Sequence, residues 1–158
     1  MAKMSVTCPI CGFTAKTDEP IPACPQCGAN LMQPSGEIVL DKVHGSYSTG
    51  HIGGTAGWLF LTNMRLFFIK DAANSTGYAV GGLIGMAVQG AINKNKTDRM
   101  DVCLALGDIA PLEDTKVALM KALQLSSKTQ GFICNLVIPK RDEWRDKINS
   151  AIFQYAPR

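Results

Sequence analysis

The chain has 158 residues, of which 46% are hydrophobic and 18% are charged, and its formal net charge is +3. This composition excludes a disordered chain, and the length allows one ordinary domain with a small appendage. The charge alone does not indicate nucleic acid, because a nucleic-acid interface needs a clustered basic face.

A short motif occurs twice in the first part of the chain, which we expect to form a small domain over residues 1–34. Cys8–Gly12 reads CPICG and Cys24–Gly28 reads CPQCG, with 12 residues between Cys11 and Cys24. Two thiolates at i and i+3 of a tight turn can grip one face of a tetrahedral ion, and the glycine lets backbone amides approach the sulfurs. The second pair completes the tetrahedron. The motif therefore predicts a closed structural metal site with the ligands Cys8, Cys11, Cys24 and Cys27.

Paired CPxCG knuckles at this separation resemble the zinc ribbon family over Ser5 to about Leu31. The resemblance implies structural Zn²⁺ as the cofactor, and the metal would supply most of the folding free energy of a segment with almost no core. Rubredoxins also use a CPxCG knuckle, for iron, but they separate their pairs by a longer segment and pack aromatic rings around the metal. Phe13 is the only aromatic residue before Tyr47, so zinc is the better interpretation.

The electrostatics of this first domain disfavour DNA or RNA as its partner. Lys3 and Lys16 are opposed by Asp18 and Glu19, and a zinc tetrathiolate adds about two negative charges. A phosphate-binding surface needs the opposite sign. We expect a small folded unit that docks on a protein.

The use of cysteine indicates a reducing compartment. Four of the six cysteines belong to the metal motif, and Cys103 and Cys134 lie in apolar runs, where buried thiols are inert packing residues. The first residues, MAKMSVTCPI, contain no apolar core of the length that a signal peptide needs. We expect a cytoplasmic protein, and an insertion described below leaves peripheral attachment to a membrane open.

A compositional break at Gln33–Gly36 separates the first domain from a second one, residues 37–156. Its centre is Gly57–Asp71, in which two apolar arms flank Thr62–Arg65, and this pattern predicts a tight hairpin. Both arms are apolar on both faces, so the hairpin must lie in a sheet that is covered on more than one side. Gly45–Gly57 holds five glycines and no phosphate-loop pattern, which predicts a mobile connection between two strands.

The rest of the second domain reads as strands followed by one helix. Glu37–Leu40, Val102–Leu106 and Gly131–Ile138 read as strands, whereas Leu112–Leu125 fits a helix and a strand equally well. From Lys140 the period becomes helical, and one apolar stripe opposes charges of both signs that we interpret as a solvated surface. The stripe consists of Trp144, Ile148, Ala151, Ile152 and Tyr155.

The order of these segments resembles the GRAM domain, a member of the pleckstrin-homology-like (PH-like) superfold, over about Glu37 to Tyr155 minus one insertion. The matching residues lie in the hairpin, in an I-x-x-L-E-D segment and in the final helix; they are Gly57, Leu59, Leu61, Thr62, Asn63, Arg65, Leu66, Phe68, Ile109, Leu112, Glu113, Asp114, Glu143, Trp144 and Ile148. The resemblance implies an α+β fold in which a bent antiparallel sheet or barrel is capped by the C-terminal helix. It also implies a binding module, since related proteins engage phosphoinositides, other lipids or polypeptides. No basic run follows the hairpin, near which Arg65 and Lys70 lie, so the resemblance does not extend to phosphoinositide specificity.

The departure from the GRAM pattern is a glycine-rich insertion at residues 75–98, which we expect to be helical. Gly77, Gly81 and Gly85 repeat at four-residue spacing, and in a helix they form a ridge that another helix can approach closely. The segment is too short to span a bilayer, since about 20 apolar residues are needed. Three interpretations stay open: self-association into a homo-oligomer or packing on its own domain, contact with an anionic membrane surface, or a disordered loop. The residues expected to make membrane or self-association contacts are Gly77, Gly81, Leu83, Ile84, Gly85, Met86, Val88, Lys94 and Lys96.

No group of side chains in the sequence predicts catalysis. His44 and His51 have no nearby cysteine in sequence, and the acidic residues are scattered or paired with basic neighbours. We therefore expect a non-catalytic zinc-binding adaptor whose GRAM-like module binds a protein or a membrane lipid. The alternative is a nucleic-acid-binding zinc ribbon protein in which the second domain is only a support.

Overall fold

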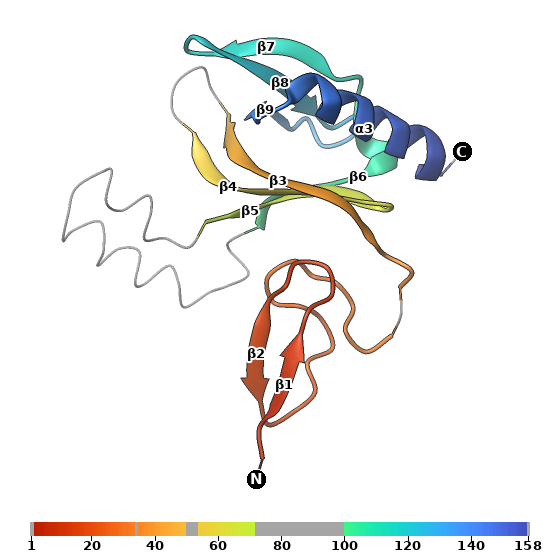
Figure 1. Ribbon diagram of the computed structural model, residues 1–158. Helices are drawn as coiled ribbons and strands as arrows, with labels where there is room; N and C mark the ends of the chain where they lie inside the picture. The colour runs from red at the N-terminus through yellow and green to blue at the C-terminus, as the bar shows by residue number, and fades with distance from the viewer. Residues whose placement is uncertain (1, 34, 50–53, 72–99, 158) are drawn as a thin grey trace, which may run out of the picture.

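The computed structural model describes residues 2–33, 35–49, 54–71 and 100–157. These residues form a two-stranded sheet of order β1-β2 and a seven-stranded sheet of order β6-β5-β4-β3-β9-β8-β7. All paired strands are antiparallel. The small sheet lies on one side of strands β3 to β6, and the C-terminal helix lies on the other side (Figure 1).

The small sheet consists of β1 (Met4–Thr7) and β2 (Thr14–Thr17). The strands of the large sheet are β3 (Val39–Ser48), β4 (Thr55–Thr62), β5 (Arg65–Lys70), β6 (Met100–Ala105), β7 (Glu113–Val117), β8 (Met120–Ser126) and β9 (Ile133–Val137). A 3₁₀ helix, η2 (Leu106–Asp108), follows β6, and the α-helix α3 (Arg141–Tyr155) comes last. No helix in the described part of the chain is long and apolar enough to cross a bilayer.

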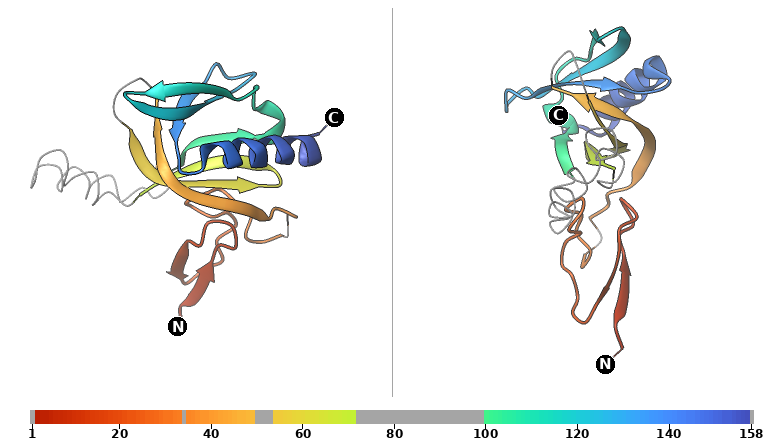
Figure 2. Two further views of the ribbon diagram at one scale, coloured as in Figure 1. Left: turned by 45° about the horizontal axis from the view of Figure 1, so that its top comes forward. Right: turned by 90° about the vertical axis from the view of Figure 1, so that its left-hand side faces the viewer.

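The large sheet bends because β3 changes its neighbours along its length. It pairs with β4 from Val39 to Tyr47, but it pairs with β9 only from Ser46 to Ser48. Two further views show β3 curving from one half of the sheet to the other, with α3 lying across the opening (Figure 2). The predicted antiparallel sheet with one C-terminal helix is therefore confirmed.

The structure corrects the prediction for one segment and decides between helix and strand for another. The prediction of a mobile connection over Gly45–Gly57 is wrong for most of that range, because β3 continues to Ser48 and β4 begins at Thr55. Leu112–Leu125, which fitted a helix or a strand, forms the β7–β8 hairpin, with Ala118 at a positive φ of 53° in its turn.

The buried apolar side chains form two clusters, one on each face of the β4–β5 hairpin. The inner cluster lies between the large sheet and α3 and includes Leu59, Leu61, Leu66, Phe68, Leu123, Leu136, Trp144 and Ile148. The outer cluster joins the sheet to the N-terminal unit and consists of Cys8, Ile10, Cys24, Cys27, Ala29, Phe60, Phe67 and Ile69. The hairpin arms are apolar on both faces because each face packs in a different cluster.

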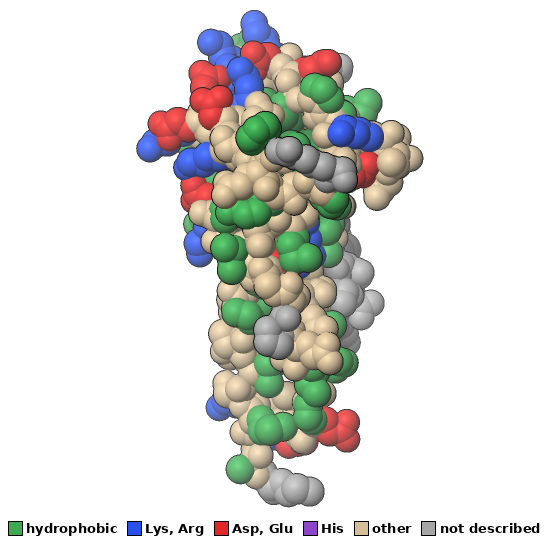
Figure 3. All heavy atoms as spheres, turned by 90° about the vertical axis from the view of Figure 1, so that its right-hand side faces the viewer, with side chains coloured by type: hydrophobic (Ala, Val, Ile, Leu, Met, Phe, Trp, Pro, Cys, Tyr) green, Lys and Arg blue, Asp and Glu red, His purple; other side chains and the backbone are tan. Residues whose placement is uncertain are grey.

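Charged and apolar side chains are distributed unevenly over the surface. On the face shown in Figure 3, lysine, arginine and acidic side chains gather at the end of the molecule that carries α3 and β7. Hydrophobic side chains are scattered over the middle of this face, between that end and the N-terminal unit. The predicted solvated surface of the helix is only partly present: Asp142, Glu143, Asp146 and Lys147 are exposed, whereas Arg141 and Arg145 are half-buried in ion pairs with Asp114 of β7.

Candidate metal centre

The first knuckle is a tight turn held by two main-chain hydrogen bonds. The Cys8 N–H donates to the Phe13 carbonyl oxygen at 2.7 Å, and the Gly12 N–H donates to the Cys8 carbonyl oxygen at 3.0 Å. Gly12 has a φ of +76°, a conformation that favours glycine, and this explains its place after Cys11. The β1–β2 pairing supports the turn, since β1 ends at Thr7 and β2 begins at Thr14.

The second knuckle repeats this geometry without a strand pair beside it. The Cys24 N–H donates to the Ala29 carbonyl oxygen at 2.8 Å, the Gly28 N–H donates to the Cys24 carbonyl oxygen at 2.8 Å, and Gly28 has a φ of +72°. The Gln26 N–H lies 3.4 Å from the Cys24 sulfur. The two CPxCG motifs therefore fold into turns of the same geometry, and each turn presents its two cysteine sulfurs in the same way.

The two knuckles bring all four predicted ligands together. The four sulfurs lie within 4.8 Å of one another, with 3.7 Å between Cys8 and Cys27 and 3.6 Å between Cys11 and Cys24. Cys8, Cys24 and Cys27 are buried, and Cys11 is half-buried. Within the described ranges, this is the only group of three or more cysteine, histidine or acidic side chains placed to hold a metal ion.

The chemistry of the donor set fits a soft or borderline cation. The hydrogen bond between the two thiols raises the pKa of Cys11 and lowers the pKa of Cys24. Full ionisation of four crowded thiols needs a cation to offset their charge. Four sulfur donors leave no position for a substrate or a water molecule, which is the arrangement of structural sites.

The metal motif packs on the outer face of the large sheet, opposite α3. Phe60 of β4 and Phe67 of β5 stack there, with ring centroids 5.1 Å apart and an interplanar angle of 2°. Both rings belong to the same buried cluster as Cys8, Cys24 and Cys27. The N-terminal unit therefore covers this face of the sheet, and it also contains the four cysteines that could hold a metal ion.

Arg65 fastens the second knuckle to the sheet. Its Nε lies 2.8 Å from Glu37 Oε1, its Nη1 donates to the Cys27 carbonyl oxygen at 2.6 Å, and its guanidinium lies 4.5 Å from the centroid of the Phe67 ring. Burial by itself would lower the pKa of Arg65, but the interactions with Glu37 and Cys103 together outweigh it and raise the pKa. The guanidinium thus stays charged between the metal motif and the hairpin.

The turn of the β4–β5 hairpin holds the segment that joins the two units. Asn63 accepts the Ile38 N–H at 2.9 Å through Oδ1 and donates to the Gly36 carbonyl oxygen at 2.9 Å through Nδ2. The Thr62 hydroxyl donates to Glu37 Oε1 at 2.9 Å. The sequence indicated these residues only as hairpin and family residues, because nothing in the pattern LTNMR shows that its side chains reach the linker.

The remaining predicted site residues belong to the glycine-rich insertion, which lies outside the described residues. They are Gly77, Gly81, Leu83, Ile84, Gly85, Met86, Val88, Lys94 and Lys96. The expected helix and its membrane or self-association contacts therefore stay predictions.

Comparison with known proteins adds a fold and no function. No family model matches the chain, and no curated protein matches it. Among solved structures, the C-terminal domain of an unknown protein from Leishmania infantum is 15% identical, covers 76% of this chain and 88% of its own, and has a TM-score of 0.50. The Vps36 N-terminal PH domain is 19% identical, covers 83% of this chain and 89% of its own, and has a TM-score of 0.48. At these identities the likeness to the Leishmania domain shows a shared fold alone.

Proposed function

We propose that this chain is a non-catalytic zinc-binding adaptor, in which a GRAM-like module of PH-like fold binds a protein or a membrane lipid. The observation that supports it best is the position of the four-thiol site. Cys8, Cys24 and Cys27 are buried against the sheet, and four sulfur ligands leave no open coordination position, so a metal bound there would have a structural role. A zinc ion held by these four cysteines would cross-link the two knuckles and stabilise the N-terminal unit that packs on the sheet.

The binding role is supported by the architecture together with the family resemblance. A bent antiparallel sheet closed by a C-terminal helix is the arrangement that the GRAM-like motifs imply, and these motifs occupy the β4–β5 hairpin and the start of α3. Fold alone does not define a ligand. We therefore leave the ligand class at protein or lipid, and we place the adaptor in the cytoplasm, free or peripheral at a membrane.

The glycine-rich insertion enters this proposal through its sequence. Its apolar residues offer area to a bilayer or to a second copy of the chain, and Lys94 and Lys96 offer positive charge to anionic headgroups. The test is co-sedimentation with neutral and anionic liposomes, with the intact chain compared with a variant in which residues 77–96 are a short Gly-Ser loop. Binding that is lost in the variant supports a membrane adaptor, and a Lys94→Gln, Lys96→Gln double variant separates charge from apolar contact.

Two further measurements complete the test. Light scattering after size exclusion shows self-association, and a strict monomer with and without the insertion contradicts that function of the segment. Elemental analysis of the purified protein should give one zinc per chain, and stoichiometric iron in its place contradicts the zinc assignment. Absence of liposome binding by both forms moves the proposal to protein partners.

A further inference from the structure

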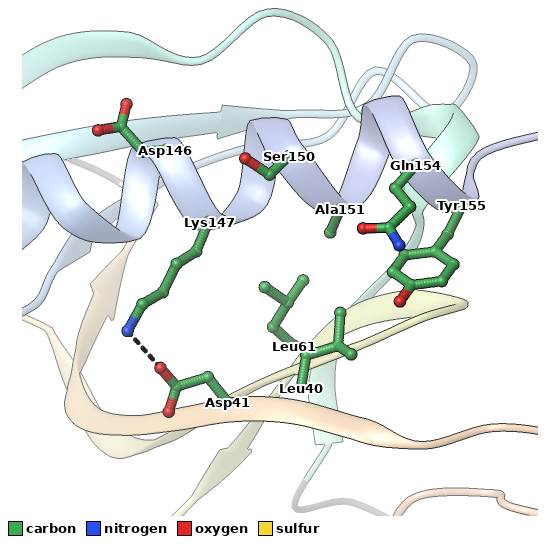
Figure 4. A pocket seen from close by; sticks show the side chains of 9 residues that line it. All are labelled: Leu40, Asp41, Leu61, Asp146, Lys147, Ser150, Ala151, Gln154 and Tyr155. Carbon is green, nitrogen blue, oxygen red and sulfur yellow. Dashed lines mark hydrogen bonds and ion pairs between the residues drawn. The ribbon is translucent and has the colours of Figure 1, made fainter.

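An apolar pocket of about 360 Å³ lies between α3 and β3, but its charged side chains are not placed to orient a ligand. Leu40 of β3 and Tyr155 of α3 line it (Figure 4). Tyr155, which was predicted as part of the apolar stripe of the helix, is 37% exposed there. The Lys147 ammonium is paired with Asp41, and the Asp146 carboxylate points away from the pocket (Figure 4). A surface that combines exposed apolar side chains with unpaired charges lies elsewhere, at the turn of the β7–β8 hairpin.

The end of the β7–β8 hairpin extends beyond its neighbour in the sheet. The two strands pair as far as Val117 and Met120, whereas β9 pairs with β8 only from Leu123 onward. Val117 and Ala122, at the base of this overhang, are buried. Figures 1 and 2 show the hairpin at the end of the molecule opposite the N-terminal unit. The hairpin is therefore anchored at its base and projects at its turn.

The turn presents two apolar side chains to solvent. Leu119 is 97% exposed and Met120 is 54% exposed. Only Ala118 and Leu119 separate the paired residues Val117 and Met120, and Ala118 has a φ of 53°, a conformation that is uncommon for a residue with a Cβ. Folding of the chain leaves the Leu119 side chain in water, so burial of this side chain requires a partner.

Two lysines face each other directly behind the apolar turn. Lys116 and Lys121 are paired in register and exposed, and neither forms an ion pair with another residue in the described ranges. The acidic residues of the hairpin, Glu113 and Asp114, lie at the other end of β7, where Asp114 pairs with arginines of α3. Like charges directly opposite each other on neighbouring strands are destabilising. An anionic partner would offset this repulsion.

The order of these side chains along the hairpin matches the order of groups at the surface of a bilayer. The apolar side chains lie at the extreme end, and Lys121 follows Met120 by one residue, about 3.4 Å along the strand. Peripheral membrane anchors bury apolar side chains about 5–10 Å into the boundary between headgroups and acyl chains, while lysine ammonium groups stay with the phosphates. A bilayer can enclose a projecting turn from all sides, whereas a protein partner would need a cavity of matching shape.

We propose that the turn of the β7–β8 hairpin inserts into the surface of an anionic phospholipid membrane. Leu119 and Met120 enter between the headgroups, and Lys116 and Lys121 contact the lipid phosphates. The inference rests on the proposed binding function of the module and names its ligand as membrane lipid. It adds a contact that is separate from the glycine-rich insertion. Since no shaped pocket takes part, the contact selects negative surface charge and not one particular headgroup.

The test is co-sedimentation of the full chain with two kinds of vesicle, phosphatidylcholine alone and phosphatidylcholine mixed with phosphatidylserine. Leu119→Ser removes the apolar side chain at the turn. The matched control is Ile133→Ser, at a residue that is 55% exposed and pairs with Ser126 at the other end of β8. Leu119→Ser should keep the native thermal midpoint, because folding does not bury Leu119.

The charges are tested by a Lys116→Gln, Lys121→Gln double variant. Its matched control is a Lys3→Gln, Lys128→Gln double variant, which changes the net charge by the same amount at two other exposed lysines. The variant in which residues 77–96 are a Gly-Ser loop is compared in the same vesicles, so that the contributions of the hairpin and the insertion are measured separately.

The native chain should bind the phosphatidylserine vesicles more tightly than the neutral ones. Leu119→Ser should weaken this binding about tenfold or more, as expected for one leucine that is no longer buried, and Ile133→Ser should leave it unchanged. The Lys116→Gln, Lys121→Gln variant should weaken binding to the anionic vesicles about tenfold or more. Its thermal midpoint should not fall, because the substitution removes a repulsion.

Binding that is lost in the Gly-Ser loop variant but intact in both hairpin variants overturns the inference, while the proposed membrane contact of the insertion stands. A native chain that binds no vesicles overturns the inference and leaves the module with a protein ligand. Native-like binding by Leu119→Ser together with a loss in the lysine variant shows attraction without insertion and overturns the inference. An equal loss in the Lys3→Gln, Lys128→Gln control assigns the attraction to net charge and also overturns it.

Discussion

Arg65 is the residue on which the contact between the two units depends most. Its planar guanidinium reaches Glu37, the Cys27 carbonyl oxygen and the Phe67 ring at once. A lysine ammonium has neither the fork to hold the carboxylate nor the flat face to lie over the ring. The side chains of Arg65 and Glu37 are only 16% and 6% exposed, so the pair is screened little by solvent.

Glu37→Gln should therefore destabilise the protein by about 2 kcal/mol, because a buried guanidinium loses the charge on its hydrogen-bond partner. Glu143→Gln makes the same chemical change at the exposed pair with Lys140, where the side chains are 73% and 60% exposed. That control should change stability by less than about 0.5 kcal/mol. Urea unfolding followed by tryptophan fluorescence measures both. Equal effects in the two variants contradict a buried role for Glu37.

The two cysteines outside the metal motif should differ sharply in reactivity. Burial raises the pKa of the Cys134 thiol to about 12, whereas Cys103 is exposed and lies 3.7 Å from Arg65 Nη1. In the metal-loaded protein at about pH 8.5, iodoacetamide should alkylate Cys103 roughly a hundredfold faster than Cys134, as judged by peptide mass spectrometry.

The raised pKa of Cys134 also has a consequence for stability at high pH. Its contribution is complete below the usual thiol pKa, about 8.5, and decreases as the pH rises toward 12, because the unfolded chain loses the proton first. Cys134→Ala should abolish this part of the alkaline destabilisation. Equal alkylation rates of Cys103 and Cys134 in the folded protein contradict both expectations.

At the scale of elements, two glycines that face each other allow neighbouring strands of the large sheet to approach closely. Gly45 of β3 and Gly57 of β4 are paired in register. A Cβ at Gly45 would lie 2.6 Å from the Val137 carbonyl oxygen, and a Cβ at Gly57 would lie 2.2 Å from the Ile69 carbonyl oxygen. These contacts are with main chain of the neighbouring strands β9 and β5, which cannot rotate away. The strands approach closely here because both positions lack a side chain.

Gly57→Ala should destabilise the protein by about 2 kcal/mol or more, since the added methyl collides with main chain in a packed sheet. The matched control is Gly107→Ala, where the nearest atom to an added Cβ is Pro157 Cδ at 3.6 Å, an ordinary contact. The control should stay within about 0.5 kcal/mol of the native chain. Thermal unfolding followed by circular dichroism compares them, and a native-like midpoint for Gly57→Ala contradicts the close approach.

The same glycines show where sequence patterns mislead. A glycine-rich run usually predicts a loop, but Gly45 and Gly57 lie within strands. They are glycine because main chain of a neighbouring strand leaves no room for a side chain, and a local sequence pattern does not show that neighbour. The β4–β5 hairpin was predictable because its apolar arms and polar turn are local features. Leu112–Leu125 was not, since its apolar spacing fits two periods and only pairing with β9 selects the strand form.

Some residues of the candidate site were likewise predictable from local sequence, and others were not. The four cysteines were found from spacing, because a tetrahedral ion imposes that spacing on the chain itself. The contribution of Arg65, Asn63 and Glu37 could not be found, since these residues act across 25 to 38 positions of sequence. The pocket between β3 and α3 was equally hidden, because its lining residues Leu40 and Tyr155 lie far apart in the sequence.

At the scale of the whole molecule, the N-terminal unit is one layer of a three-layer arrangement: the metal unit, the curved sheet, and α3. The middle layer is apolar on both faces, and each face has its own buried cluster. The outer cluster contains few side chains besides the cysteines and the rings of Phe60 and Phe67. We therefore expect that the N-terminal unit stays folded only while it is packed on the outer face of the sheet, and that this face stays buried only while the unit is folded.

Removal of the metal should expose the outer face of β4 and β5 while the inner core persists. Without the ion the knuckles lose their main source of folding free energy, and burial of each phenylalanine ring is worth about 2 kcal/mol. A strong zinc chelator should speed amide exchange in Phe60, Phe67 and Ile69 and increase the fluorescence of a dye that binds apolar surface, with little change in β8 and β9.

A Cys103→Ser variant is the control for thiol effects outside the site, and it should behave as the native chain does before and after chelation. Addition of zinc should restore protection in β4 and β5, because the cover re-forms when the four thiols ionise around the cation. If amide exchange in β4 and β5 is unchanged after full loss of metal, the structure of these strands does not depend on the metal-bound N-terminal unit. The metal would then stabilise that unit alone.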